Sequence, residues 1–311
     1  MSERVVLPLN ESDQMFMAEL SPEIERLLDQ HIASPREFYP YDFVEEMDEA
    51  IKTGDYVPED APLSPIIIAS LEVNLLTEDG LPYYTETLLR GLPKKHPFRD
   101  WIYRWTAEEG RHGPTIANWL NRTQQVDMRQ LERDRMTMMT NPDTPQPGSF
   151  IEGIAYPAFQ EPATEVSHRN TMRLLPSVHK IGKKALASVV GDEVKHGKFK
   201  DSLMEEALKV NPSLAIRAIA RQMTGFRMPG LSIPGFKEKA AMIANAGIFD
   251  AKQLHSIFER LTTKWKISER SGLTPEAEKA QVKIFRRISA IGKYATQEEE
   301  LRLAQGRLNN F

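Results

Sequence analysis

The feature that most constrains the fold is a pair of Glu-x-x-His motifs, Glu109–His112 and Glu193–His196, that lie inside apolar helical seams. Apolar residues recur at helical intervals around each motif: Ile102, Trp105, Ile116 and Trp119 around the first, and Leu186, Val189 and Leu203 around the second. This spacing is typical of the buried face of a bundle helix. Because residues three apart share a face, both motifs are predicted to point inward.

Two further helical segments each carry a single glutamate on a comparable face. Glu78 follows Leu71 and Leu75 on the first of them, and Glu161 lies on a less regular apolar face of the other. The steps from single glutamate to motif are 109 − 78 = 31 and 193 − 161 = 32 residues. The chain therefore resembles two similar helical hairpins related by an approximate twofold axis, and each long helix is expected to direct a carboxylate inward.

Converging buried carboxylates need compensating charge, because an unpaired carboxylate is costly to desolvate. Divalent metal ions supply that charge. One glutamate from each of two helices plus Glu-x-x-His from each of two others is the ligand set of ferritin-like di-iron carboxylate bundles. The sequence predicts that two iron ions (Fe²⁺/Fe³⁺) are held by six residues: Glu78, Glu109, His112, Glu161, Glu193 and His196.

The Glu-x-x-His spacing by itself is weak support. With 7 histidines and 44 acidic residues in 311 positions, about 7 × 44/311 ≈ 1 such pair arises by chance, against three observed. A histidine on an apolar face is more often a hydrogen-bonded core residue, and any single glutamate could be exposed. The joint pattern of six residues favours the metal site. The third pair, Glu165–His168, is interpreted as structural or as supporting a ligand, because Glu161 already serves that helix.

Composition narrows the remaining classes. The chain has no cysteine, which excludes disulfides, thiolate metal sites and cysteine nucleophiles. A net charge of −4 makes nucleic acid a poor first partner. The longest apolar stretches, such as 66–69, fall far short of the ~20 residues that span a bilayer. No signal or transit peptide is apparent, so we expect a cytoplasmic protein.

Helical periodicity and turn residues predict an all-α fold with a ferritin-like four-helix bundle inside a larger single domain. Residues 1–60, with five prolines, are expected to form an irregular layer with a helix or two, packed on a bundle with C-terminal helices at 61–311. Long helices are predicted over 64–89, 97–122, 150–175 and 177–210. Shorter ones are predicted over 127–139, 214–226, 236–246 and 250–264, with a loop at 141–149 and a last helix that begins near 274–276.

The motifs resemble those of a known family, the soluble acyl-(acyl carrier protein) desaturases of plant plastids and their bacterial relatives. Residues 105–113, Trp-Thr-Ala-Glu-Glu-Gly-Arg-His-Gly, differ from the family motif only at Gly110, where asparagine is usual. Similar matches occur at 77–78, 81–82, 126–132, 159–161, 163–164, 167–168, 170–171, 192–196, 265–266, 272–273 and 279–281. The resemblance covers the chain from about residue 35 onward.

The resemblance implies a helical homodimer that inserts a cis double bond into a fatty acyl chain carried as a thioester on acyl carrier protein. Two iron ions would activate O₂, and reduced ferredoxin would supply two electrons. Thr164 matches the family's threonine near the oxygen site, although it could be a helix hydroxyl bonded to its own backbone. Asp192 is a candidate to orient a ligand imidazole, although it could be a solvated helix residue.

The sequence departs from the family at several positions. Phe38 stands where the plant enzymes have a tryptophan, and Gly80 and Gly110 place flexible residues inside ligand helices. Pro157 and Pro162 flank Glu161, so that helix is expected to kink or bulge. These departures leave chain length, double-bond position and electron delivery open. The lack of a transit peptide favours a bacterial form.

Three other functions stay open: hydroxylation at the same di-iron site, iron binding without an organic substrate, and a helical interaction protein with a decayed site. The intact ligand set argues against the last, and the long C-terminal extension argues mildly against the second. Carrier proteins are acidic, so a docking patch should be basic. The candidate lysines are Lys94, Lys95, Lys180, Lys183, Lys184, Lys195, Lys198 and Lys200.

Overall fold

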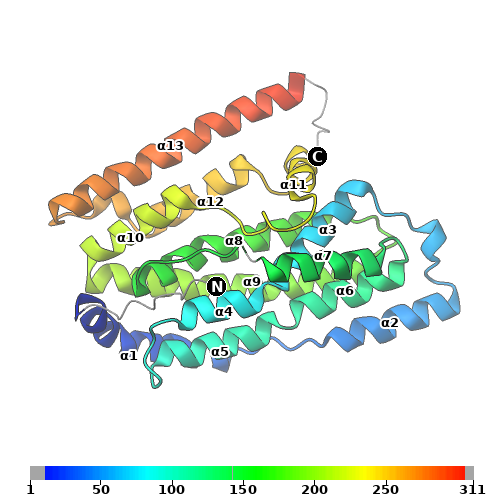
Figure 1. The fold of residues 1–311 in the computed structure, drawn as a ribbon, viewed down its shortest axis with the longest axis horizontal. Coiled ribbons are helices and arrows are strands. Elements are labelled where there is room, and N and C mark those ends of the chain that lie inside the picture. Colours follow the sequence, from blue (N-terminus) through cyan, green and yellow to red (C-terminus); the bar gives the residue numbers. More distant parts are fainter. Residues whose placement is uncertain (1–10, 142, 305–311) are drawn as a thin grey trace.

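The computed structural model describes residues 11–141 and 143–304, and across those residues every regular element is a helix (Figure 1). The all-α prediction is therefore confirmed. The elements are α1 (Glu11–Ala33), α2 (Pro40–Thr53), η1 (Pro58–Asp60), α3 (Pro65–Glu78), α4 (Leu81–Leu89), α5 (Pro97–Glu109), α6 (His112–Thr123), α7 (Met128–Thr140), α8 (Phe150–Leu174), α9 (Lys180–Val210), α10 (Pro212–Gly225), α11 (Phe236–Asn245), α12 (Ala251–Lys264), η2 (Ile267–Glu269) and α13 (Pro275–Ala304).

A bundle of α3, α5 with α6, α8 and α9 forms the centre of the molecule, and α8 packs along α9 (Figure 1). α10 and α12 pack on α8, and α13 covers α10 and α12 on the outer side. Two large clusters of buried apolar side chains fill the spaces between these layers. None of the helices in the described ranges has the length and apolarity that a membrane span requires.

The N-terminal layer is more regular than its prolines suggested. α1 packs on α9 and α5, and α2 packs on α6 and α9. Pro40 and Pro58 each occupy the first turn of an element, where a missing N–H costs nothing, so these prolines start helices rather than prevent them. Pro22 lies inside α1, and Pro8 lies outside the described residues. The division of the chain at residue 60 stays a prediction.

The predicted continuous helix 97–122 is wrong at its centre, because the chain turns tightly at the first Glu-x-x-His motif. α5 ends at Glu109 and α6 begins at His112. The N–H of Arg111 bonds to the carbonyl of Glu108, three residues back, at 3.2 Å, which tightens the last turn. Gly110 keeps right-handed helical angles, φ −58° and ψ −8°, so α6 continues beyond α5 in nearly the same direction (Figure 1).

The predicted helix 64–89 is divided in the same way beside the first single glutamate. α3 ends at Glu78, and α4 begins at Leu81. A side-chain carbon at Gly80 would lie 2.7 Å from the hydroxyl oxygen of Tyr84, so glycine leaves room for that ring. α8, by contrast, is continuous through Pro157 and Pro162, so these prolines do not end the helix that carries Glu161.

Gly182 on α9 offers a test of the packing of α9 against the bundle. A β-carbon there would lie 2.3 Å from two ring carbons of Trp119, which is fully buried. We expect Gly182→Ala to lower the free energy of unfolding by about 1–3 kcal/mol, because overpacking outweighs the helix propensity of alanine. Urea unfolding of the metal-free protein measures the change.

Gly197→Ala is the matched control, because Gly197 lies on α9 like Gly182. A β-carbon at Gly197 would lie 3.6 Å from the β-carbon of Glu161, which is an ordinary van der Waals contact. That variant should unfold with equal or slightly higher free energy. If Gly182→Ala were as stable as Gly197→Ala, the close packing of Trp119 against α9 would be wrong.

Candidate metal centre

Six side chains from α3, α5, α6, α8 and α9 converge inside the bundle, and they are the six that the sequence pattern singled out. They form two groups of four, within each of which the candidate ligand atoms lie within 4.8 Å of one another. Glu109 and Glu193 belong to both groups. Glu78 and His112 complete one group, and Glu161 and His196 complete the other, which is the arrangement expected for two ions that share two carboxylates.

The inward-facing atoms of this cluster are close together but not hydrogen-bonded. His112 Nδ1 lies 2.9 Å from Glu109 Oε2, and His196 Nδ1 lies 2.7 Å from Glu109 Oε1. Within the described residues, both Nδ1 atoms and both carboxylate oxygens of Glu161 are buried without a hydrogen-bond partner. Such orphaned atoms are costly, and imidazole nitrogens and carboxylate oxygens are ordinary ligands of iron. The residues therefore fit iron ions.

The electrostatics of the cluster follow from burial and crowding. Burial raises the pKa of Glu161 well above its usual value, and the charges of Glu109 and Glu193 raise it further. Burial also raises the pKa of Glu193. Burial tends to lower the pKa of His196, but neighbouring carboxylates, Glu109 foremost, outweigh it and raise that pKa to about 10. Several groups therefore hold protons that a metal ion would displace, since metal ligands must be deprotonated.

Asp192 contacts the outer nitrogen of one candidate ligand. Its Oδ2 lies 3.4 Å from His112 Nε2 and accepts a 2.6 Å hydrogen bond from Arg111 Nη2. Asp192 is fully buried, so it is not a solvated helix residue. The Arg111 guanidinium also lies over the ring of Phe38, 4.4 Å from its centre. Phe38 therefore touches the outer end of a chain of contacts that reaches His112.

Glu108 has the corresponding position on the other side of the cluster, at His196, and it was not among the residues predicted from the sequence. Its Oε2 lies 3.0 Å from His196 Nε2 and 2.7 Å from Nε2 of His31 on α1. Its Oε1 accepts from Arg104 at 2.7 Å and from Lys195 at 3.2 Å. A sequence signal existed, because the pair 108–109 parallels the pair 192–193, in which an outer acidic residue precedes a ligand. For His31 there was no signal, since its contact spans 77 positions.

Thr164 and His168 both contact candidate ligands. The Thr164 hydroxyl lies 2.6 Å from Glu193 Oε2 and also 2.9 Å from the backbone carbonyl of Glu161, so it bonds to its own helix and contacts a candidate ligand as well. His168 Nε2 lies 2.9 Å from Glu78 Oε1. Glu165 instead pairs with Arg169 at 2.6 Å, away from the cluster. Of the third Glu-x-x-His pair, only the histidine supports the cluster.

The prediction that Lys200 belongs to a docking patch is wrong. Lys200 is fully buried, with its ammonium 3.8 Å from the ring centre of Trp101, so it cannot belong to a surface patch. Its position one helical turn after His196 on the ligand face explains this burial. Lys195 is committed to Glu108, and Lys184 pairs with Glu46. The other candidate lysines are not excluded by their positions.

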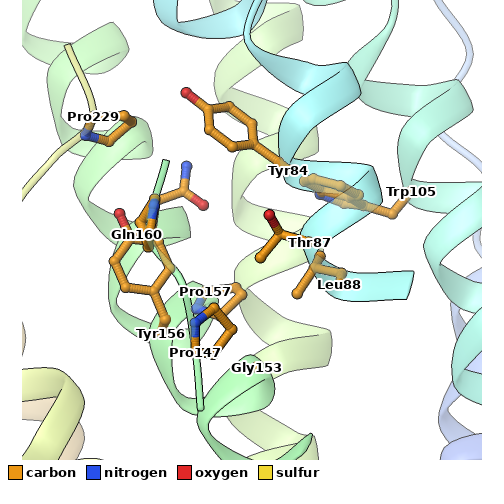
Figure 2. Close-up of a pocket in the computed structure, with 11 residues that line it drawn as sticks. Tyr84, Thr87, Leu88, Trp105, Pro147, Gly153, Tyr156, Pro157, Gln160 and Pro229 are labelled. Carbon is orange, nitrogen blue, oxygen red and sulfur yellow. The ribbon is translucent and has the colours of Figure 1, made fainter. Parts of the chain in front are cut away.

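An apolar hollow lies between α4, α5 and α8 (Figure 2). Trp105, one turn before Glu109, forms part of its wall, and Gln160, next to Glu161, forms another part. The lining residues are Tyr84, Thr87, Leu88, Trp105, Pro145, Pro147, Gly153, Tyr156, Pro157, Gln160 and Pro229. The hollow therefore extends toward two of the helices that carry candidate ligands.

Comparison with known proteins identifies the class of protein. Residues 12–309 match the family described as fatty acid desaturase, and the chain belongs to that family. The family resemblance read from the motifs is thereby confirmed.

Particular relatives agree with this assignment. The chain is 30% identical over 281 residues to DesA1 of Mycobacterium tuberculosis, described as an acyl-[acyl-carrier-protein] desaturase, covering 86% of this chain and 82% of that protein. It is 29% identical over 256 residues to a chloroplastic stearoyl-[acyl-carrier-protein] 9-desaturase of Gossypium hirsutum, covering 77% and 63%. The crystal structure of DesA2 from M. tuberculosis has the same fold, with a TM-score of 0.64, 24% identity, and coverage of 86% and 99%.

Glu108 provides a test of the outer contacts of the cluster. We expect Glu108→Gln to weaken the binding of one of two metal ions by about 10- to 100-fold, because a neutral amide no longer holds the His196 ring as the carboxylate does. Anaerobic titration of the metal-free protein with Co(II), followed by visible absorption, measures both affinities.

Glu165→Gln is the control, since Glu165 pairs with Arg169 on the same bundle and does not contact the cluster. Its two affinities should equal those of the unaltered protein. Unchanged binding by Glu108→Gln would show that this carboxylate does not orient a metal ligand.

Proposed function

We propose that this protein catalyses the O₂-dependent desaturation of a fatty acyl chain carried as a thioester on acyl carrier protein. The observation that carries the proposal is the twofold set of four glutamates and two histidines, together with an apolar hollow between α4, α5 and α8. The named activities of the relatives support the same reaction. We further propose that reduced ferredoxin supplies two electrons and that the protein is a homodimer, both on the family resemblance alone.

The six residues would hold two iron ions. Glu78 and His112 would bind one ion, Glu161 and His196 the other, and Glu109 and Glu193 would lie between them. When bound, two irons supply the activation of O₂ that is needed to remove hydrogen from an unactivated methylene, which no side chain achieves alone.

The protein's own residues prepare this chemistry by orientation. Asp192 and Glu108 lie against the outer Nε2 atoms of His112 and His196, so each ring turns its Nδ1 toward the cluster. The Thr164 hydroxyl donates to Glu193 and fixes that carboxylate. Such contacts define ligand orientation before any ion binds, and preorganised ligands are what an active metal site requires.

The hollow favours an enzyme that acts on an acyl chain over a protein that only stores iron. Its walls are mostly apolar, with Tyr84, Thr87, Tyr156 and Gln160 as the polar exceptions, which suits a hydrocarbon chain and excludes water. A protein that only stores iron has no use for such a slot. Hydroxylation of the same bound chain is the second candidate, since it needs the same cluster and the same hollow.

Metal content and product mass test the proposal. After anaerobic Fe(II) loading we expect about two irons per chain by elemental mass spectrometry, and their loss in Glu109→Ala/His196→Ala because two ligands are removed. With reductant, O₂ and acyl carrier protein, a product two mass units lighter indicates desaturation and one sixteen units heavier indicates hydroxylation, from the removal of H₂ or the addition of O. Folded protein that retains less than a tenth of an iron would overturn the di-iron mechanism.

Gly153 tests whether the hollow holds the acyl chain. A β-carbon there would lie 4.0 Å from Leu88 and Pro147, so a larger side chain must extend into the hollow. We expect Gly153→Leu to lower kcat/KM for the longest accepted acyl chain by about tenfold or more and to spare shorter chains, because it removes the volume of several methylenes. Competition between acyl chains of different length measures the shift.

Gly225→Leu, on α10 where nothing lies within 4 Å of an added β-carbon, serves as the control and should leave the preference unchanged. Equal loss for all chain lengths in Gly153→Leu would argue that the acyl chain lies elsewhere.

A further inference from the structure

The N-terminal helix α1 places a histidine against the candidate metal centre, although α1 supplies none of the six candidate ligands. His31 Nε2 lies 2.7 Å from Glu108 Oε2, the same oxygen that lies 3.0 Å from His196 Nε2. His31 and Glu108 are 6% and 3% exposed, and His196 is fully buried. A chain of two hydrogen bonds therefore joins α1 to a candidate ligand.

The donors around Glu108 define the roles of the atoms in this chain. Oε1 of Glu108 accepts from Arg104 and Lys195, and Oε2 lies between the two ring nitrogens. A carboxylate surrounded by donors accepts, so the His31 ring donates through Nε2.

The His31 ring is held in place by packing as well. It stacks on His196 with ring centres 6.0 Å apart, and it meets the edges of Trp101 at 6.4 Å and of Phe199 at 6.0 Å. Its donor nitrogen consequently has one direction available, toward Glu108. A ring fixed on three sides can in turn fix the carboxylate that it contacts.

The two halves of the cluster differ in the contacts of the outer carboxylate, which is Glu108 in one half and Asp192 in the other. On the other half, Asp192 lies 3.4 Å from His112 Nε2, receives an arginine hydrogen bond from Arg111, and has one oxygen without a hydrogen-bond partner in the described residues. Within the described residues no second histidine contacts Asp192, whose other oxygen lies 3.8 Å from Arg36 Nε, whereas both oxygens of Glu108 accept hydrogen bonds. The approximate twofold symmetry of the ligands is thus broken by α1.

We propose that His31 is a positioning residue for the candidate metal centre: its hydrogen bond holds Glu108 where that carboxylate orients His196. The inference rests on the proposed function, because it concerns how the same cluster binds metal. It assigns to α1 a part in the function of the bundle, and it predicts that the ion bound by Glu161 and His196 depends on α1 whereas the other ion does not.

A surface hollow makes this proposal testable by chemical rescue. His31 lines it together with Gln30 of the same helix and Lys195, Lys198 and Phe199 of α9. Removing the His31 ring would join the vacated space to this hollow, and free imidazole is small enough to enter it. Imidazole could then restore the missing N–H donor opposite Glu108.

The experiment titrates metal-free protein anaerobically with Co(II) and follows visible absorption. We expect His31→Ala to lower the affinity for one of the two Co(II) ions by about tenfold, since loss of a group that orients a metal ligand lowers metal affinity by that order. His31→Gln, whose amide can donate to Glu108, should lose less, and free imidazole should restore the affinity of His31→Ala. Gln30→Ala, from the same helix and hollow, should behave as the unaltered protein.

The outcomes separate the alternatives. Unchanged affinities in His31→Ala would overturn the proposal, and so would a loss that neither glutamine nor imidazole reduces, because that pattern indicates packing alone. If His31→Ala does not fold, the Co(II) affinities of His31→Gln and Gln30→Ala are compared instead. Equal affinities in those two variants would then overturn the proposal. Failure of the unaltered protein to bind Co(II) would instead count against the proposed function, which the variants do not test.

Discussion

The structure depends on the burial of four carboxylates and two imidazoles at the centre of a helical bundle. Such groups are costly to remove from water, and apolar packing alone cannot offset that cost. Contacts with the surrounding residues offset part of this desolvation cost. Asp192 and Glu108 contact the two imidazoles, and Thr164 and His168 contact two of the carboxylates. Within the described residues, the Nδ1 atoms of His112 and His196 and both carboxylate oxygens of Glu161 still lack a hydrogen-bond partner, and two cations would complete the arrangement there.

The same requirement explains why two helices are interrupted where they are. Glu78, Glu109 and His112 stand at the ends of α3, α5 and α6, and a glycine lies next to each interruption. An unbroken α-helix spaces its side chains at fixed angles, whereas a tight turn adjusts the angle between Glu109 and His112. We therefore interpret Gly80 and Gly110 as residues that allow the chain to turn beside the candidate ligands.

Much of the site could be predicted from sequence because helical periodicity is a local property. The seam around Glu109 and His112 indicates which face is buried, and the near-equal steps along the chain pair the four helices. The misses have a common cause. The docking role of Lys200, the irregular N-terminal layer and the continuous helices were judged from local composition, but each was decided by what packs against the segment. Lys200 is buried because Trp101 faces it from another helix.

The sequence by itself determined the all-α class, the family and the six candidate ligands, because each depends on residue type and on spacing along single helices. Only the tertiary structure decided which carboxylates belong to both groups of candidate ligands, where the helices break, that Glu108 contacts His196, and that an apolar hollow lies between α4, α5 and α8. Those features join helices that are far apart in the chain, and the distance between two helices depends on the packing of every side chain between them. His31, 77 positions from its partner Glu108, is the clearest case.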